Sequence, residues 1–297
     1  MRAIILSALA CTTVGCGITA STASTASTAP QSLTLPMKYT EKGHAYVMAT
    51  LNHTVTHPMI LDSAANVGIL PVNLKAALAL PEDKLSKMDV QGASGSSELV
   101  LATIDHTSVG HLAAESLPYV FKDMTRLDVE GVLPGILGHG YMSQYCNVFD
   151  FKNNELSLYQ GACPSSVTQG LESESFKIDN NFIKLTASFN GEEVDAVLDT
   201  GAPTNYINSH LANKLTLTLG EEDISRGLND QATKKVAIGS LRFSLGGKEI
   251  INTESHLSDM PVFEVLGYKD EPFILLGLSN FNDDKLIIDY AKNKIYF

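Results

Sequence analysis

The chain carries one sequence pattern twice. Around Asp62 it reads MILDSAANVGILPVNLKAAL, and around Asp199 it reads AVLDTGAPTNYINSHLANKL, an offset of 137 positions (199 − 62). Each copy has an apolar run, an Asp, a hydroxyl residue, a small residue and an Ala, and each has a Leu twelve positions after the Asp (Leu74 and Leu211). Because similarity at a long fixed spacing indicates a duplicated structural unit, the fold has to accommodate two related halves.

A second pair of matching segments lies downstream in the same order. They read PGILGHGYMSQYCNVFDFKNNELSLY and FILLGLSNFNDDKLIIDYAKNKIYF. Gly138 matches Gly277 and Asp150 matches Asp289, both at an offset of 139 (277 − 138 and 289 − 150). The two blocks keep their register within two residues, which predicts two complete repeats. Asp150 and Asp289 themselves are expected to be turn or strand-edge residues of terminal hairpins.

The secondary structure of both repeats is expected to be mainly β. Short alternating or β-branched runs bounded by turn residues predict strands. Asn190-Gly191 predicts a two-residue hairpin turn between two of them. The segments NLKAALAL and NSHLANKL each predict one short helix. The strand-forming runs are AYVMATL, ELVLATI, YVF, FIKLTASF, VAIGSLRFSL and KLIIDY.

The N-terminus has the features of an export signal. After Met1-Arg2, an apolar run reaches to about Gly15, which has the length of a signal-peptide core and is short for a membrane span. The following Ser-Thr-Ala repeats are uncharged and predict a flexible tether. The stretch 161–175 between the repeats is rich in Gly, Ser and Pro. We therefore predict a signal peptide (1–16), a tether (17–37), an N-terminal lobe (38–160), a linker (161–175) and a C-terminal lobe (176–297).

The cysteines bear on where the protein resides. The stretch ending at Cys16 resembles a bacterial lipobox, and the stretch ending at Cys11 is a rival. A lipidated N-terminal Cys would attach the chain to a bacterial membrane; ordinary cleavage after an alanine is the alternative. The expected location is the periplasm or the cell surface. In that oxidising setting Cys146 and Cys163 are a candidate disulfide, with two buried thiols as the alternative.

Charge and histidine spacing exclude other classes of function. A net charge of −12 without a Lys/Arg cluster argues against nucleic acid as a partner. His53 and His57 have an H-x-x-x-H spacing, but on a strand their rings would lie about 13 Å apart, too far for one metal ion. We interpret this segment as an exposed loop and expect no metal or cofactor.

The repeated Asp can support hydrolytic chemistry. A buried strand delivers Asp199 into a sharp turn, where the Thr200 hydroxyl and the backbone at Gly201 can meet the carboxylate. A pseudo-two-fold axis between the repeats would bring Asp62 beside it. Two adjacent carboxyl groups cannot both ionise, so they share one proton and provide an acid and a base. Such a pair can activate water to attack a peptide carbonyl.

These motifs resemble those of the retropepsin and pepsin-like aspartic proteases. The block Asp199-Thr200-Gly201-Ala202 with Gly277 downstream carries the resemblance in the second repeat, and Asp62-Ser63-Ala64-Ala65 with Gly138 carries it in the first. The resemblance spans roughly residues 40 to 297. It implies a bilobal double-psi β-barrel fold and an aspartic endopeptidase acting on protein or peptide substrates.

The same resemblance assigns roles to individual residues. It implies that Asp62 and Asp199 are catalytic, that Ser63 and Thr200 brace the opposite loops, and that Ala64 and Gly201 shape the turns. It also implies a substrate-covering flap that contains Gly92 and Ala93, with residues 226–230 at the matching place in the second repeat.

Ala64 departs from the family, which has Gly at this position. If position 64 needed a positive φ, its methyl group would cost about 1 kcal/mol. Three interpretations follow: an active, monomeric two-lobed protease; an inactive pseudoprotease that binds peptides at the cell surface; or a duplicated β domain whose aspartates cap turns. In a variant of the first, only the second lobe is catalytic and pairs with its twin in a homodimer.

Since Ala65 and Ala202 lack a hydroxyl that could lower the carboxyl pKa values, we expect an active pair to work nearer neutral pH than a gastric-type enzyme.

Overall fold

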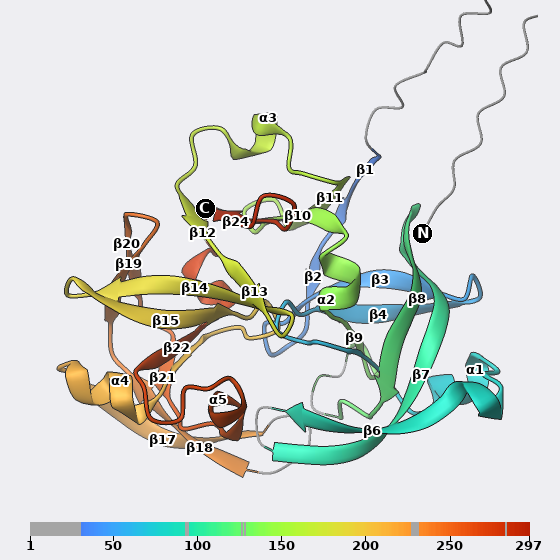
Figure 1. Cartoon of the computed structure of the whole chain (residues 1–297), viewed down its shortest axis with the longest axis horizontal. Helices are drawn as coiled ribbons and strands as arrows, with labels where there is room; N and C mark the ends of the chain where they lie inside the picture. The colour runs from blue at the N-terminus through green and yellow to red at the C-terminus, as the bar shows by residue number, and fades with distance from the viewer. Residues whose placement is uncertain (1–30, 93–94, 126, 128, 227–231, 283) are drawn as a thin grey trace, which may run out of the picture.

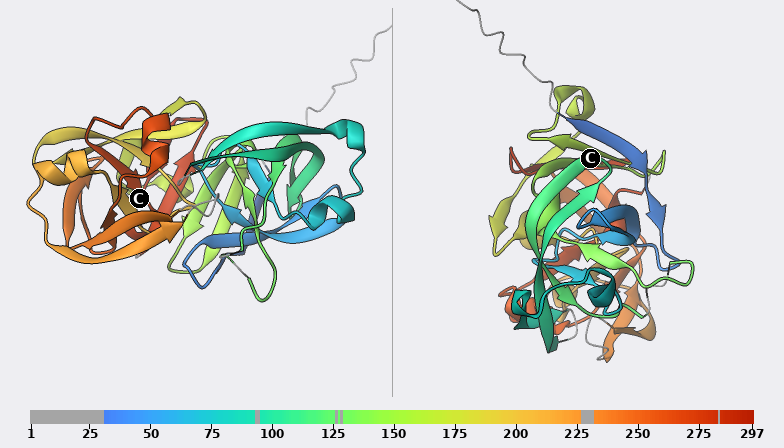
Figure 2. Two further views of the ribbon diagram at one scale, coloured as in Figure 1. Left: turned by 90° about the horizontal axis from the view of Figure 1, so that it is seen from below. Right: turned by 90° about the vertical axis from the view of Figure 1, so that its right-hand side faces the viewer.

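The computed structural model describes residues 31–92, 95–125, 127, 129–226, 232–282 and 284–297. Strands dominate this part of the chain, as the sequence predicts, and two similar lobes lie side by side (Figure 1, Figure 2). The signal peptide and most of the tether fall outside the described residues and stay predictions. In the part that is described, no helix is long and apolar enough to cross a membrane.

The described strands form three sheets, one in each lobe and one shared between them. The sheet of the N-terminal lobe has the order β2 (Lys38–Tyr39), β3 (Ala45–Leu51), β4 (Val55–Leu61), β9 (Gly135–Leu137), β5 (Gly68–Leu70), β8 (Leu112–Phe121), β7 (Gly95–Val109), β6 (Leu85–Gly92). The sheet of the C-terminal lobe has the order β17 (Leu219–Arg226), β18 (Ala232–Ile238), β21 (Ser255–Leu257), β16 (Asn205–Ile207), β22 (Phe273–Leu276), β15 (Glu192–Leu198), β14 (Phe182–Phe189), β19 (Leu241–Leu245), β20 (Lys248–Asn252), with β13 (Lys177–Asp179) on β14.

The third sheet joins the lobes. Its order is β1 (Ser32–Pro36), β11 (Glu155–Gln160), β10 (Tyr145–Asp150), β23 (Lys285–Asp289), β24 (Lys294–Tyr296), β12 (Ser173–Ser175). Strand β10 of the first repeat pairs antiparallel with β23 of the second, so the ends of the two repeats are hydrogen-bonded to each other. The helical turns are α1 (Leu74–Ala77), α2 (His139–Met142), α3 (Ser165–Thr168), α4 (Ser209–Lys214), α5 (Pro261–Val265) and the 3₁₀ turns η1 (Glu82–Lys84) and η2 (Leu278–Asn280).

Strand pairing shows that the sequence repeat is a structural repeat. In the N-terminal lobe β4 runs parallel to β9, with Leu61 opposite Leu137. In the C-terminal lobe β15 runs parallel to β22, with Leu198 opposite Leu276. All four leucines are buried, so in each lobe an apolar pair of strands leads directly to the repeated Asp. The predicted hairpin at Asn190-Gly191 is confirmed, because β14 and β15 pair across it.

Two expectations about segments are wrong. The tether was expected to reach residue 37, but β1 pairs with the edge of β11, and Leu33 and Leu35 on alternate positions pack against the core. The predicted linker, 161–175, ends in β12, which pairs with β24 at the edge of the shared sheet. The single strand predicted over VAIGSLRFSL is two strands, because the chain turns at Gly239, whose N–H donates to Thr218 O at 2.8 Å.

The interpretation of the His53–His57 segment as an exposed loop is correct only for its turn. His53 lies at positive φ in the β3–β4 turn and stacks on His106, with ring centroids 3.8 Å apart. His57 lies on β4, is buried, and hydrogen-bonds through Nε2 to Leu133 O at 2.7 Å. Its backbone pairing with β3 and this side-chain partner compensate for its burial.

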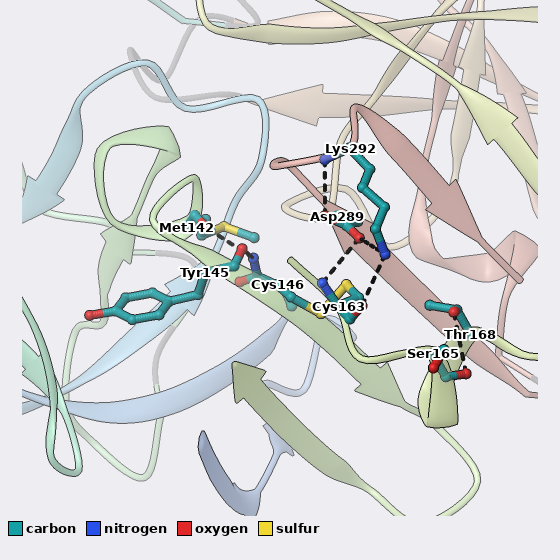
Figure 3. The surroundings of a disulfide bond; sticks show 9 residues. Met142, Tyr145, Cys146, Cys163, Ser165, Thr168, Asp289 and Lys292 are labelled. Atoms are coloured by element: carbon teal, nitrogen blue, oxygen red, sulfur yellow. Dashed lines mark hydrogen bonds and ion pairs between the residues drawn. A yellow bond between two sulfur atoms is a disulfide. The ribbon is translucent and has the colours of Figure 1, made fainter. Parts of the chain in front are cut away.

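Cys146 and Cys163 form a disulfide, with an S–S distance of 2.09 Å, that fastens the linker to the shared sheet (Figure 3). Buried Asp289 lies beside it: its Oδ2 accepts from Cys163 N at 3.0 Å, and its Oδ1 accepts from Lys292 N at 3.1 Å in the β23–β24 turn. Asp150 accepts similarly from Asn153 N, so both repeated aspartates are turn residues, as expected.

Removal of the disulfide should lower the free energy of unfolding and leave the geometry of the candidate site intact. A loop of this length, 17 residues of sequence separation, predicts a loss of about 3 kcal/mol in the Cys146→Ala/Cys163→Ala variant. Chemical denaturation of the variant, beside the wild type with and without reductant, measures it. Equal denaturation midpoints in all three samples would contradict the prediction.

Candidate active site

Asp62 and Asp199 each lie at the end of a buried strand and above an apolar element from the same lobe. Asp62 follows β4, and its N–H donates to Leu137 O at 3.0 Å. Asp199 follows β15, and its N–H donates to Leu276 O at 2.9 Å. The element that ends in Gly138 or Gly277 therefore passes beneath each Asp-containing loop. A Cβ at either glycine would lie 2.3 or 2.2 Å from a backbone oxygen of that loop, so only Gly allows this close passage.

The two carboxyl groups meet between the lobes. Ala64 N–H donates to Asp62 Oδ1, and Gly201 N–H donates to Asp199 Oδ1, both at 2.9 Å. Both side chains line the same cleft, and they are close enough for the charge of Asp62 to raise the pKa of Asp199. The site thus holds one carboxyl group from each repeat within a single chain.

Ser63 and Thr200 link the two loops through four reciprocal hydrogen bonds. Ser63 Oγ donates to Leu198 O at 2.9 Å, and Thr200 Oγ1 donates to Leu61 O at 2.9 Å. Each hydroxyl oxygen also accepts from the opposite backbone: Ser63 N–H donates to Thr200 Oγ1 at 2.9 Å, and Thr200 N–H donates to Ser63 Oγ at 3.0 Å. Both side chains are fully buried, so these hydroxyl groups are satisfied only by the opposite loop.

Gly201 and Ala64 differ in what a methyl group meets. A Cβ at Gly201 would lie 2.4 Å from Asp62 Cγ, so this glycine is required for the carboxyl groups to approach each other. The backbone of Ala64 does not have a positive φ, so the strain that a methyl group would cause in that conformation does not arise. Its methyl group packs against the apolar cluster of the C-terminal lobe that contains Val197 and Ala202.

Burial dominates the electrostatics of the pair. Desolvation raises the pKa of Asp62 to about 6, against hydrogen bonds from the Ala64 N–H, Asp199 and the Ala65 N–H that lower it. Desolvation and the charge of Asp62 raise the pKa of Asp199 well above its ordinary value. Both shifts favour the protonated form, so the pair keeps a proton to a higher pH than two isolated carboxyl groups would. Since both pKa values are raised on folding, the stability contributed by these groups is present below the unfolded-state pKa and is lost as pH rises through the folded-state values.

Tyr290 is a neighbour of the pair that the sequence did not reveal. Burial and the charge of Asp62 raise its pKa. Its hydroxyl and His139 Nδ1 are both buried without a hydrogen-bond partner among the described residues, and the two rings meet edge to face at 5.5 Å. The first repeat has Phe151 at the position of Tyr290, so the only signal in the sequence was this difference between the repeats.

A cleft of about 960 Å³ opens above the two carboxyl groups, and both lobes line it. The hairpin of β6 and β7 covers the N-terminal side, and Met88 and Val90 face the cleft from β6. Gly92 pairs with Gly95 at the end of this hairpin, whereas Ala93 lies outside the described residues. The hairpin of β17 and β18 is its counterpart along the same lower edge of the molecule in Figure 1, and most of the segment expected at its tip, 227–230, also lies outside them.

Among the described residues, no group of three or more His, Cys, Asp or Glu side chains is arranged to hold a metal ion. The polar groups at the centre of the cleft are the two carboxyl groups and the backbone amides that hold them.

The comparison with protein families agrees with this geometry. The aspartyl protease family model matches the chain twice, over residues 47–140 and 185–279, one match in each lobe. A search of curated proteins gives no match. The two matches cover more than half of the chain and contain both Asp-containing loops. The chain belongs to the aspartyl protease family, as a two-lobed member with the family domain duplicated.

Proposed function

We propose that this protein is an aspartic endopeptidase in which Asp62 and Asp199 activate a water molecule for attack on a peptide bond. The observation that carries the proposal is the meeting of two half-buried carboxyl groups, one from each lobe, in a cleft lined by both lobes, where Gly201 of one loop lies directly against the Asp62 carboxyl group of the other. A buried carboxyl pair with one proton has both an acid and a base available at the same point.

The raised pKa values set the direction of proton transfer. In the first step the ionised Asp62 accepts a proton from water, the water oxygen bonds to the carbonyl carbon, and Asp199 donates its proton to the carbonyl oxygen. In the second step the C–N bond breaks: the amine leaves with the proton held by Asp62, and a hydroxyl proton of the tetrahedral intermediate returns to Asp199. Atoms and charges balance, and the pair returns to its starting state.

The hydroxyl links give this chemistry its geometry. Because Ser63 and Thr200 each bond to the opposite loop, a shift of one lobe would break buried hydrogen bonds before it separated the carboxyl groups. Such a rigid pair costs little reorganisation during the reaction, which is the basis of preorganised catalysis.

Substitution of either catalytic carboxyl group should abolish cleavage. In a peptide library, Asp62→Asn and Asp199→Asn should each lose about 10²–10⁴-fold in kcat/KM, because each removes the base or the acid. Both variants should keep the fold, since Asn can accept the same backbone hydrogen bond. Pepstatin should inhibit the wild type. If neither variant changes a measurable rate, the pair is not the catalyst; if the wild type binds peptides but cleaves none, the protein is a peptide-binding pseudoprotease.

The pH profile should have its optimum above about 6. Below the pKa of Asp62, at about 6, both carboxyl groups are protonated and no base remains, so kcat/KM falls as pH falls. Above the raised pKa of Asp199 the acid is lost and the rate falls again. An optimum below pH 4, measured with a fluorogenic peptide, would contradict the burial that raises both pKa values.

The two loop positions should differ in whether they tolerate a methyl group. Gly201→Ala places a Cβ 2.4 Å from Asp62 Cγ and should lower kcat/KM by about 10²-fold or more. Ala64→Gly is the matched control, and it should fold and retain activity within about threefold, since the Ala64 backbone is unstrained. Equal rates for Gly201→Ala and the wild type would show that the carboxyl groups do not need this approach.

A further inference from the structure

The strand registers match the two lobes residue by residue. The pairing of β4 with β9 places Ile60 opposite Ile136, and the pairing of β15 with β22 places Val197 opposite Leu275. All four side chains line the cleft. They form matching parts of two pockets, one on each side of the carboxyl pair. At these four positions both pockets are apolar.

The neighbouring strand pairs, β5 with β8 and β16 with β21, carry different side chains in the two lobes. In the N-terminal lobe β5 pairs with β8, with Ile69 opposite Val120. In the C-terminal lobe β16 pairs with β21, with Tyr206 opposite His256. Each of these pairs lies beside the strand described above, through β5–β9 and β16–β22. Tyr206 therefore takes the place of Ile69, and His256 takes the place of Val120.

The hairpins above the pockets differ in the same sense. Met88 on β6 lies opposite Leu99 on β7, whereas Asp223 on β17 lies opposite Lys235 on β18. The two cross-strand pairs correspond, because the residues two positions after Leu99 and Lys235 pair with Val120 and His256, respectively. An apolar pair in one lobe is thus an ion pair in the other, with Lys235 Nζ 3.4 Å from Asp223 Oδ2.

Tyr206, His256 and Lys235 line the C-terminal side of the cleft and bring polar side-chain groups to it. His256 Nδ1 lies 3.3 Å from Thr204 Oγ1, and the His256 ring stacks on Tyr206 at 5.6 Å. Burial lowers the pKa of His256 and the charge of Lys235 lowers it further, so the ring is neutral near pH 7 and carries one N–H. Lys235 is largely covered, with 21% of its side chain exposed, whereas the Asp223 side chain is 71% exposed.

These groups disfavour an apolar occupant. An alkyl side chain placed against Lys235, His256 and Tyr206 would remove water from their donors without replacing the hydrogen bonds, and such unpaired groups are costly. An oxygen acceptor, by contrast, would satisfy them. At the matching positions of the N-terminal lobe, Ile69 and Val120 carry no hydrogen-bond donor in their side chains and belong to an apolar cluster with Ile60, so this part of the cleft favours alkyl groups.

We propose that the pocket of the C-terminal lobe, formed by Tyr206, His256 and Lys235, selects a substrate side chain that ends in an oxygen acceptor, a carboxamide or a carboxylate. The pocket of the N-terminal lobe takes an apolar side chain. Because neighbouring residues of an extended peptide point in opposite directions, the two pockets receive the two residues that flank the cleaved bond. This specificity rests on the proposed endopeptidase function.

The test uses one cleaved library peptide, remade with Gln, Glu or Leu at each flanking position. The wild type should prefer Gln or Glu over Leu by at least about 10-fold in kcat/KM at one position, and Leu over Gln at the other. Tyr206→Ile/His256→Val copies the N-terminal lobe and should reverse the first preference without changing the second. The matched control, Ile69→Val, should alter only the second.

Two single variants test the roles of the Tyr206 hydroxyl group and of the Lys235 ammonium group separately. Tyr206→Phe removes only a hydroxyl and should weaken the Gln preference even if the double variant does not fold. Lys235→Met should lower cleavage of the Glu peptide more than that of the Gln peptide if a carboxylate is bound through the ammonium group.

Binding separates this inference from the proposed function. Fluorescence anisotropy with labelled versions of the same peptides and the Asp199→Asn protein gives the order of affinities without cleavage. Suppose that the wild type cleaves none of the peptides, and that Gln or Glu peptides nevertheless bind more tightly than Leu peptides. The endopeptidase proposal then fails and the pocket assignment stands. If Leu is preferred at both flanking positions, or if Tyr206→Phe and the double variant leave the order unchanged, the pocket assignment is wrong.

Discussion

The pair of adjacent carboxyl groups, held by two loops that hydrogen-bond to each other, is the constraint on which the candidate site depends. Two adjacent, partly desolvated carboxyl groups are stable only if donors meet them from fixed directions and their loops stay in place. Here the backbone amides of Ala64 and Gly201 supply the donors, and the hydroxyl groups of Ser63 and Thr200 fix each loop to the opposite strand. Each lobe therefore completes the site of the other.

The shared sheet holds the two lobes in the arrangement that brings the carboxyl groups together. Strand β10 pairs with β23, which ties the ends of the repeats together, and the disulfide holds the linker against the same sheet. The symmetry is followed closely at the backbone and departs from identity in the side chains. Ala64 holds the position in the first repeat that Gly201 holds in the second, and Tyr206 and His256 occupy the places of Ile69 and Val120. One backbone plan thus supports two chemically different pockets.

Much of this arrangement could be predicted from the sequence because it depends on the repeat. The offsets at Asp62/Asp199 and Gly138/Gly277 predicted the two lobes, and the turn at Asn190-Gly191 followed from local φ preferences. What could not be predicted depends on long-range pairing. No local pattern shows that residues 32–36 complete the edge of β11, or that His57 finds Leu133 O across the lobe.

The same limit applied to the candidate site. The concern over Ala64 assumed a positive φ, whereas the requirement for glycine at the matching position is steric and comes from Asp62 on the other lobe. The effect of Asp62 on Tyr290 could not be predicted, because it depends on the path of the shared sheet. The polar pocket likewise depends on long-range pairing, because the registers of β16 with β21 and of β5 with β8 place His256 where the other lobe has Val120.

One chain contains one complete carboxyl pair, with a contribution from each lobe. Isothermal titration calorimetry with pepstatin, on protein whose mass in solution is measured in parallel, tests this most directly. We expect one inhibitor bound per monomeric chain, with binding weakened in Asp62→Asn and Asp199→Asn alike. One inhibitor per two chains, or undiminished binding in Asp62→Asn, would contradict it.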